Sequence, residues 1–350
     1  MVGQRVTIVD IARELGISKS LVSNALHDRG RVSAATRQRV RTTAAAMGYV
    51  SNRAAQQLRS SRYGTIGLMI PSEVRALSFY MQVTMGVSEA SADGGSDLML
   101  YTQINEESRV SLDVPIDGAI VCDPIPEDPR IDQLARARVP VVTIGPTDDA
   151  QALQVAGTIS IDFAQAVSQL FNRADQSNQA KAPALLMPVA PVVPVWLNNV
   201  RDSYRHECRI RGLEPREVPL PLDLAPEDRR HHANDPDRDG EAPLRAFVQS
   251  LLREEHSSWI VVFQGLASTL RALATELTNT SSLPPVVAFP SDPMSDALDS
   301  GIISIDFRAR DYGRAAAELL GTVSERSGLS STGLSCETPC LVETHSVMLL

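Results

Sequence analysis

Residues 1–50 carry apolar positions with a helical period. In the first segment the apolar residues stand at positions i, i+3, i+4 and i+7, namely Ile8, Ile11, Ala12 and Leu15. Thr7 precedes them as a typical N-cap, and Gly16 follows as the residue type that best adopts the left-handed conformation at a helix end. The pattern predicts a short helix between Thr7 and Gly16 with one buried face.

A second short helix is predicted directly afterwards. Ser18 is its expected N-cap, and the helix runs from Lys19 to about Leu26 with an apolar face of Val22, Ala25 and Leu26. Its other side carries side chains that can hydrogen-bond to bases or phosphates: Lys19, Ser20, Ser23 and Asn24. Two short helices joined by a tight turn predict a helix-turn-helix, whose second helix can enter the major groove of DNA.

A third helix completes the head, which we place at residues 1–50. Ser33 is its expected N-cap, its apolar positions include Val40, Ala44 and Met47, and Gly48 is expected to end it. Residues 51–63 form a separate segment that is competent to form a helix but too short and polar to be stable alone. We therefore expect it to act as a hinge and linker that folds only against DNA and a second copy.

From residue 64 onward, short apolar runs alternate with helical stretches. The expected strands are Thr65–Ile70, Asp97–Tyr101, Asp117–Cys122, Val139–Ile144, Ala184–Met187, Trp259–Phe263 and Pro285–Phe289, and a helix is expected over about Ser78–Ala92. This alternation predicts a parallel, doubly wound α/β arrangement for residues 64–350. The runs Pro183–Pro194 and Glu227–Ala242 are interpreted as irregular surface segments, the latter as a solvated loop rather than a His/Asp metal site.

Charge is distributed very unevenly along this chain of net charge −9. Residues 1–62 hold ten arginines and Lys19 against three acidic residues, a net charge of +8, whereas residues 63–350 hold 22 basic and 39 acidic residues, a net charge of −17. A small basic head on a large acidic body predicts that only the head approaches a polyanion.

Other composition features narrow the class of protein. The sequence contains no apolar run long enough to cross a membrane and no signal-peptide core at its start, so we expect no membrane partner and a cytoplasmic, nucleoid-associated location. The four cysteines include one closely spaced pair, Cys336 and Cys340, but no second pair that would complete a metal site. We therefore expect free thiols and neither metal nor cofactor. The absence of a P-loop, a nucleophile elbow or an H-E-x-x-H motif argues against an enzyme.

Several segments occur in a familiar order and nearly without gaps. They are Val6–Ala12, Gly16–Ser18, Leu21–Ser23, Arg31–Ser33, Thr36–Val40 and Gly48–Tyr49 in the head, and Gly64–Leu68, Asp117–Val121 and Tyr312–Leu320 in the body. On these segments the chain resembles the lactose-repressor (LacI/GalR) family over almost its whole length. The resemblance implies a helix-turn-helix head and a periplasmic-binding-protein-like effector and dimerisation body, with two lobes joined by crossings near Asp162, Pro290 and Glu325.

The resemblance also assigns roles in the head. It places Lys19, Ser20 and Asn24 at base-reading positions, and it places Leu58 as the hinge residue that wedges into the minor groove at the operator centre. The full set of expected DNA-binding residues is Thr7, Ser18, Lys19, Ser20, Ser23, Asn24, His27, Arg31, Ser33, Asn52 and Leu58. Asn24, Leu21 and His27 depart from the residues usual in the family, which bears on the operator sequence and not on DNA binding itself.

The effector cleft departs further from the family pattern. The usual sugar-binding Arg aligns with Val200, beside Arg201. The Asn-Asp pair is replaced by Phe263–Gly265, and the Gly-Phe-Asp segment becomes Ala288–Pro290. Because unpaired buried hydroxyls cost about 1–3 kcal/mol each, an ordinary hexose is a poor candidate effector. The expected cleft residues are Phe79, Trp196, Asn199, Arg201, Gln264 and Phe289.

Two ligand classes and two rival functions stay open at this point. The cleft suits a ligand with a flat or apolar part, or an anion held by Arg201. Alternatively, Asn198, Asn199 and Arg201 rebuild a polyol site. The chain is expected to be a homodimeric, sequence-specific regulator that acts as a repressor. The rivals are a non-specific DNA-binding protein and a regulator that responds to no effector because Phe and Pro close the cleft.

Overall fold

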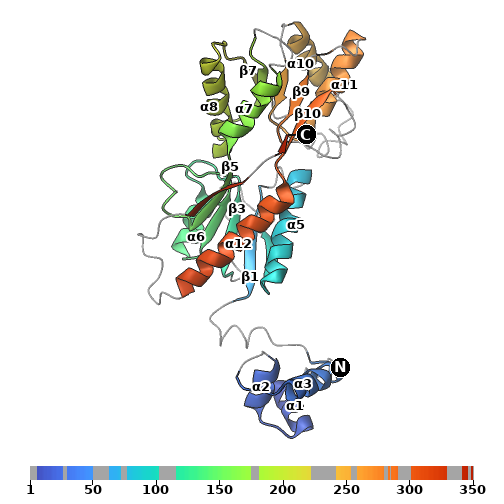
Figure 1. The fold of residues 1–350 in the computed structure, drawn as a ribbon, viewed down its shortest axis with the longest axis vertical. Coiled ribbons are helices and arrows are strands. Elements are labelled where there is room, and N and C mark those ends of the chain that lie inside the picture. Colours follow the sequence, from blue (N-terminus) through green and yellow to red (C-terminus); the bar gives the residue numbers. More distant parts are fainter. Residues whose placement is uncertain are drawn as a thin grey trace. The chain divides into compact units, whose positions relative to one another are not determined.

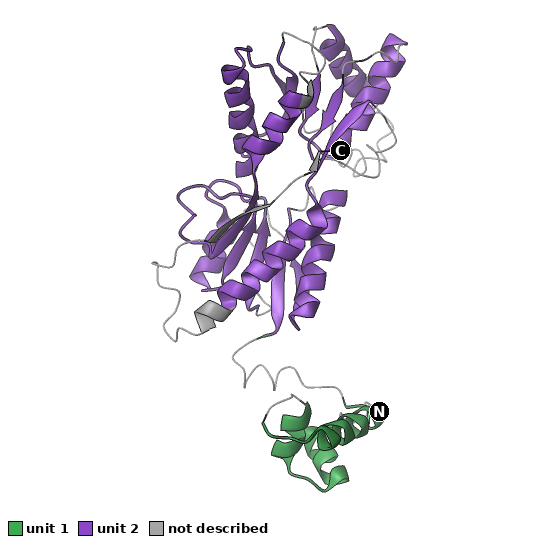
Figure 2. Ribbon diagram, viewed as in Figure 1, with its two compact units in different colours: residues 1–63 green, residues 64–350 purple. Residues whose placement is uncertain are grey.

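The computed structural model describes residues 6–26, 30–49, 63–71, 77–101, 116–174, 181–221, 242–253, 258–279, 283, 285–290, 301–328, 341–345 and 348–349. The chain forms two compact units, Met1–Tyr63 and Gly64–Leu350 (Figure 2). Together they confirm the expected class, an all-α head followed by a two-lobed α/β body (Figure 1).

The head consists of three helices, α1 (Ile8–Leu15), α2 (Lys19–Leu26) and α3 (Ala34–Ala46). They enclose a small core of fully or nearly fully buried residues: Ile11, Ala12, Val22, Ala25, Val40 and Ala44. All six stand at positions that the helical period assigned to apolar faces or their immediate continuation, so the pattern predicted this core from the sequence.

The first lobe of the body contains a six-stranded sheet in the order β11-β5-β4-β3-β1-β2. Its strands are β1 (Thr65–Met69), β2 (Asp97–Tyr101), β3 (Gly118–Cys122), β4 (Val141–Ile144), β5 (Gly157–Ile161) and β11 (Leu341–His345), all paired in parallel. Helices α5 (Ser78–Asp93) and α12 (Ala309–Gly328) cover one face, and α6 (Pro129–Arg136) covers the other (Figure 1). Ile120 and Val121 show the strand alternation, since they enter different buried clusters on opposite faces.

The second lobe contains a six-stranded sheet in the order β12-β10-β9-β8-β6-β7. Its strands are β6 (Ala184–Val189), β7 (Glu217–Pro221), β8 (Trp259–Val261), β9 (Val286–Ala288), β10 (Ile302–Asp306) and the antiparallel β12 (Met348–Leu349). Helices α7 (Phe163–Ala174) and α8 (Val195–Ile210) lie on one side of this sheet, and α10 (Ala242–Arg253) and α11 (Leu266–Thr278) on the other (Figure 1).

Three crossings connect the lobes, but two of them differ from the expected positions. The first lies at Asp162, between β5 and α7, as expected. The second does not lie at Pro290, because β10 still pairs with β9 in the second sheet; the chain crosses between Asp306 and Ala309. The third does not lie at Glu325, which is part of α12; it lies between β11, paired with β5, and β12, paired with β10.

For the run Pro183–Pro194 the interpretation as an irregular surface segment was wrong, whereas the strand predicted within it, Ala184–Met187, is confirmed. Residues 184–189 of this run form β6, which pairs with both β7 and β8, and residues 184–188 are buried. The run contains four prolines, which suggested an irregular segment. Pro188 is nevertheless accommodated next to β7, and the apolar residues Leu185, Leu186 and Met187 have the stronger influence. The run Glu227–Ala242 lies outside the described residues except for Ala242, which begins α10.

Candidate DNA-binding head and effector cleft

Local side-chain caps hold the three helices of the head. Thr7 and Asp10 form a capping box on α1: the Thr7 hydroxyl accepts from the Asp10 N–H, and the Asp10 carboxylate accepts from the Thr7 N–H at 2.9 Å. The Thr7 hydroxyl also donates to the Asp10 carboxylate at 2.7 Å. This hydrogen bond, the one from the Thr7 N–H and the nearby charge of Arg13 hold the pKa of Asp10 below its usual value. Gly16 ends α1 with φ 63°, which is the left-handed residue expected from the sequence.

Ser18 and Ser33 act in the same way on α2 and α3. The Ser18 hydroxyl accepts from the Leu21 N–H at 3.2 Å, and the Ser33 hydroxyl accepts from the Thr36 N–H at 3.2 Å. Both side chains remain exposed. Thr7, Ser18 and Ser33 are therefore the residues that start the three helices, and their hydroxyls are already engaged in capping.

The polar side of α2 presents the expected base-reading residues. Lys19 and Ser20 are exposed, whereas Ser23 and Asn24 are half-buried. The Asn24 side chain lies against Gly30, where a Cβ would come within 3.3 Å of its Nδ2 atom. The left-handed φ of 66° at Gly30 and this close approach to Asn24 both favour glycine at this position.

One arginine of the head contacts the end of a neighbouring helix. Arg39 donates to the carbonyl oxygen of Leu15 at 3.4 Å and so satisfies the C-terminal end of α1, a contact that sequence reasoning missed because it spans 24 positions. Arg31 and Arg41 are exposed. Three of the expected DNA-binding residues, His27, Asn52 and Leu58, lie outside the described residues, as does the segment 51–62.

The body contains a pocket of about 360 Å³ where the second crossing meets both lobes. Its lining comes from the start of α5, the loop after β8, Pro290 and the crossing itself: Ser78, Phe79, Gln82, Gln264, Pro290 and residues 306–311. The pocket lies beyond the carboxyl ends of β8, β9 and β10, which is where parallel α/β sheets usually bind ligands. Two of the expected effector residues, Phe79 and Gln264, meet here.

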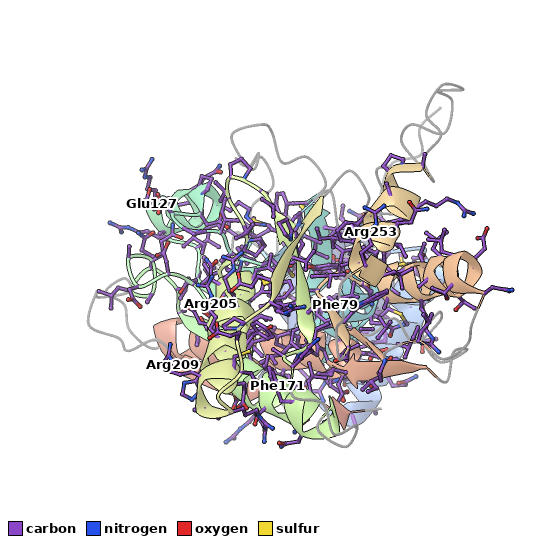
Figure 3. The ribbon with its side chains drawn as sticks, turned by 90° about the horizontal axis from the view of Figure 1, so that it is seen from above. Phe79, Glu127, Phe171, Arg205, Arg209 and Arg253 are labelled. Atoms are coloured by element: carbon purple, nitrogen blue, oxygen red, sulfur yellow. The ribbon has the colours of Figure 1, made fainter. Side chains whose placement is uncertain are left out.

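Phe79 and Gln264 are also bonded to each other. The Phe79 N–H donates to Gln264 Oε1 at 3.0 Å across 185 positions of sequence, and the Gln264 side chain is buried. Phe79 lies near the middle of the body when this is viewed from above, whereas Arg209, at the far end of α8, lies at the margin (Figure 3).

The other four expected effector residues do not line this pocket. Trp196 stacks on Phe163 with ring centroids 5.9 Å apart, and Phe289 is fully buried against Phe163 and Phe307. Arg201 lies 3.5 Å from the carboxylate of Glu217 and its guanidinium contacts Asn198, while Asn199 is exposed. Arg201 therefore already has an acidic partner.

Sequence reasoning missed the charged part of the pocket lining. Asp306 ends β10, Arg308 lies in the second crossing with a φ of 49°, and Asp311 lies in the first turn of α12. The Arg308 backbone N–H donates to Asp306 and its guanidinium to Asp311. The signal was the cluster of charged residues at 306–311, which begins at the end of the strand Ile302–Asp306. It was overlooked because the crossing was expected at Pro290.

Asp123, directly after β3, is a buried carboxylate with a φ of 48°. Burial raises its pKa to about 6, while the hydrogen bond from the Tyr80 hydroxyl and the charge of Arg130 act in the opposite direction. Burial, followed by the charge of Asp123, also raises the pKa of Tyr80 well above its usual value.

The turn after Asp123 is fixed by a buried ion pair. Arg130 binds Asp128 at 2.6 Å and also donates to the carbonyl oxygens of Cys122 and Asp123. Because both partners are buried and bonded several times over, removing one would leave an uncompensated buried charge. This pair holds the loop at the carboxyl end of β3 in one conformation.

The described residues contain neither a candidate metal cluster nor a membrane-spanning helix. No cluster of three or more His, Cys, Asp or Glu side chains there is arranged to hold a metal ion. Among the described helices, none is both long enough and apolar enough to span a membrane. Cys122 and Cys208 are buried free thiols, and burial raises the pKa of each.

Comparison with known proteins gives consistent matches for the head and the whole chain. The family model described as "Bacterial regulatory proteins, lacI family" matches residues 7–52. The maltose regulon regulatory protein MalI of Escherichia coli (strain K12) is 32% identical over 148 residues, covering 40% of this chain and 42% of that protein. The matched stretch thus spans less than half the length of that relative.

Two further comparisons extend this picture. MalI of Vibrio furnissii is 36% identical over 100 residues, which cover 29% of this chain and 72% of that protein. A crystal structure of the lac repressor dimer bound to operator and the anti-inducer ONPF matches with a TM-score of 0.72 and 17% identity, covering 99% of this chain and 98% of that chain. This last likeness concerns the fold alone.

Proposed function

This chain belongs to the lacI family of bacterial regulatory proteins, and we propose that it is a sequence-specific transcriptional regulator, acting as a repressor, whose operator affinity is changed by a small molecule. The observation that carries the proposal is the head: α1 and α2 form a capped helix-turn-helix that presents Lys19 and Ser20 to solvent within a segment of net charge +8. Its acidic body would be repelled by DNA, so the basic head makes the contact.

Within the head we assign two kinds of contact. Lys19, Ser20 and Asn24 on α2 read base edges, and exposed Arg31 binds phosphate without sequence preference. We further propose that Asn52 and Leu58 act in the hinge, Leu58 as an apolar wedge in the minor groove at the centre of the operator. A flexible pyrimidine–purine step there would lower the cost of the kink.

The body supports a homodimer. Met81 and Met85 stand one turn apart on α5 and are 58% and 45% exposed, and Leu100 on β2, the edge strand of the first sheet, is 40% exposed. Exposed apolar side chains on one helix and the adjacent edge strand are typical of an interface. A second copy is the proposed occupant because a two-fold pair of heads matches a two-fold operator, and the structurally similar lac repressor is a dimer on its operator.

The pocket at the second crossing is the proposed effector site. Its aromatic side chain Phe79 and amide Gln264 suit a ligand with a flat or apolar part, and its charged groups are already paired, as Arg308 is with Asp311. Arg201 lies 3.5 Å from the Glu217 carboxylate and is not part of this lining. Because Arg201 was the expected partner of an anion, its position favours the ligand with a flat or apolar part. We propose no enzymatic activity and a cytoplasmic, nucleoid-associated location.

Selection of bound fragments from genomic DNA, followed by footprinting, tests this function. We expect a pseudo-palindrome whose two half-sites are each covered by one head, with enhanced cleavage at a central kink. Protection of a single asymmetric half-site by one protomer would contradict the dimeric regulator. Uniform protection of unrelated fragments would instead indicate the non-specific DNA-binding protein that composition left open.

A further inference from the structure

Two helices at the cleft begin without a side-chain cap of their own. The N-cap of α5 is Leu77 and that of α8 is Pro194, and neither side chain forms a capping hydrogen bond. The first backbone N–H groups of a helix have no partner within the helix, so they need an acceptor from elsewhere. Here the acceptors come from the opposite lobe in both cases.

The two contacts are reciprocal. On α5, in the first lobe, the Phe79 N–H donates to Oε1 of Gln264, which belongs to the second lobe, at 3.0 Å. On α8, in the second lobe, the Val195 N–H donates to the carbonyl oxygen of Pro124, which belongs to the first lobe, at 2.9 Å. Each lobe therefore supplies the cap for a helix of the other.

Both acceptors are held in position by their own lobes. Gln264 is 3% exposed and lies between β8 and Gly265. Gly265 is the N-cap of α11 and has a φ of 76°. Pro124 follows Asp123 in the loop that the buried Asp128–Arg130 pair fixes. Rigid acceptors on both sides mean that the two hydrogen bonds form together when the lobes are close and break together when they separate.

Aromatic side chains fill the space between these two contacts. Ring centroids follow one another at 6.2 Å from Phe79 to Phe307, 5.0 Å from Phe307 to Phe289, 6.4 Å from Phe289 to Phe163 and 5.9 Å from Phe163 to Trp196. Such separations are those of interacting aromatic pairs. The row begins in the first turn of α5 and ends in the first turn of α8, and one buried apolar cluster includes residues of both sheets, such as Ile120 and Leu185.

We infer that reciprocal helix capping by Gln264 and by the Pro124 carbonyl latches the two lobes together in the protein without any ligand. An effector then acts on an equilibrium already biased toward the closed body, and it shifts that equilibrium only as far as it binds one form better than the other. The latch is a property of the protein alone; its influence on operator affinity rests on the proposed function.

Amide-resolved hydrogen exchange on the full chain, without DNA or ligand, tests the latch. Gln264→Leu keeps a side chain of similar size but removes the hydrogen-bond acceptor. We expect hydrogen exchange about three- to tenfold faster at the Phe79 amide and at the Val195 amide. The second effect is decisive, because Gln264 does not contact Val195. Gln249→Leu, an exposed position of α10 in the same lobe, is the matched control and should change neither rate.

Two results would overturn the inference. Faster exchange at Phe79 alone would show that Gln264 is a local cap with no effect on lobe closure, and unchanged exchange at both amides would show that its hydrogen bond does not hold the lobes. Far-UV circular dichroism checks that the variant is folded. If Gln264→Leu does not fold, Gln264→Asn retracts the acceptor while keeping an amide, and the same two amides decide. Operator affinity, measured separately, tests the proposed function and leaves the latch result unaffected.

Discussion

Individual polar residues of the head are proposed to make different kinds of contact with DNA, either to base edges or to phosphates. Asn24 is half-buried on the polar side of α2, and Arg31 is exposed beyond its end. For Asn24→Ala we expect relaxed discrimination at one base pair by about 1–3 kcal/mol, because an amide that contacts a base edge is lost. Competition binding against a set of single-base operator variants measures this effect.

The matched control for Asn24 is Arg31→Ala. Loss of a phosphate contact should weaken binding to all sequences about equally and reduce the salt slope by about 1. An unchanged specificity profile for Asn24→Ala would mean that α2 lies in the groove in a different register from the one proposed.

Asp123 makes stability depend on pH in an unusual direction. Its pKa is raised to about 6 in the folded chain, so between about pH 4 and pH 6 the folded state binds more protons than the unfolded state, and stability falls as pH rises. The loss, complete above the folded pKa, amounts to about 3 kcal/mol. Asp123→Asn removes this titration. The free energy of unfolding of the variant, relative to that of the wild type, should therefore increase by that amount between pH 4 and pH 7. Urea unfolding of both proteins measures it, and parallel pH profiles would contradict the assignment.

At the residue scale, local chemistry was predictable and distant partners were not. Thr7, Ser18, Ser33 and Gly16 were identified correctly because capping depends on neighbours within three or four positions. Gln264 was chosen only as a polar residue in the cleft, since its partner Phe79 lies 185 positions away. Trp196 and Phe289 both pack against Phe163, which follows the first crossing. These contacts join residues that are far apart in the sequence, so no local pattern predicts them.

At the scale of elements, α5 and α12 pack unusually closely. A Cβ on Gly86 of α5 would overlap the carbonyl oxygen of Arg310, and one on Gly313 of α12 would overlap that of Val83. Ion pairs of Arg310 and Arg314 with Glu89 flank the contact. The glycines are needed here for close approach of two backbones, and this fixes the start of α12 beside the pocket.

Gly86→Ala should therefore force α5 and α12 apart and lower the free energy of unfolding by about 2–3 kcal/mol. Gly321→Ala on α12 is the control, because a Cβ there meets nothing within 4 Å and the position is exposed. It should stabilise the protein by about 0.5–1 kcal/mol, since alanine favours a helix more than glycine does. Thermal or urea unfolding of the two variants should give opposite signs; destabilisation by both would point to a general intolerance of α12.

Strands and helices were largely predictable because both lobes follow the alternation of apolar runs and helical stretches. Asp97–Tyr101 was predicted to the residue, and most other strands within two residues. Strands β5, β7, β10, β11 and β12 were not among the predicted strands, and two of the crossings were misplaced. Proline was given too much weight as a breaker: the second crossing was expected at Pro290 and not at Asp306–Ala309, and β6, predicted to end at Met187, continues through Pro188. A cis Phe289–Pro290 bond follows β9 within the second lobe, so Pro290 marks a turn there and not a crossing.

At the scale of the whole molecule, the proposed dimer face is the feature that links body and operator. Met81 and Met85 are exposed on α5 and face away from the contact with α12, which uses Val83 and Gly86. Burying a methionine side chain contributes about 1.5–3 kcal/mol, and a two-fold interface would bury each of these twice. A dimer of this kind raises the operator affinity of each head, because the second head binds as part of the same molecule.

The double substitution Met81→Glu and Met85→Glu should therefore weaken dimerisation at least about hundredfold, since it places charges where apolar area is buried. Sedimentation velocity across a range of protein concentrations measures this, and operator binding at the same concentrations should weaken in parallel. Leu153→Glu is the control, because Leu153 is 73% exposed in the same lobe but on neither α5 nor β2, and it should remain dimeric. Dimers that persist in the double variant would place the two-fold interface on another face, and a monomeric Leu153→Glu would show that added charge alone disperses the protein.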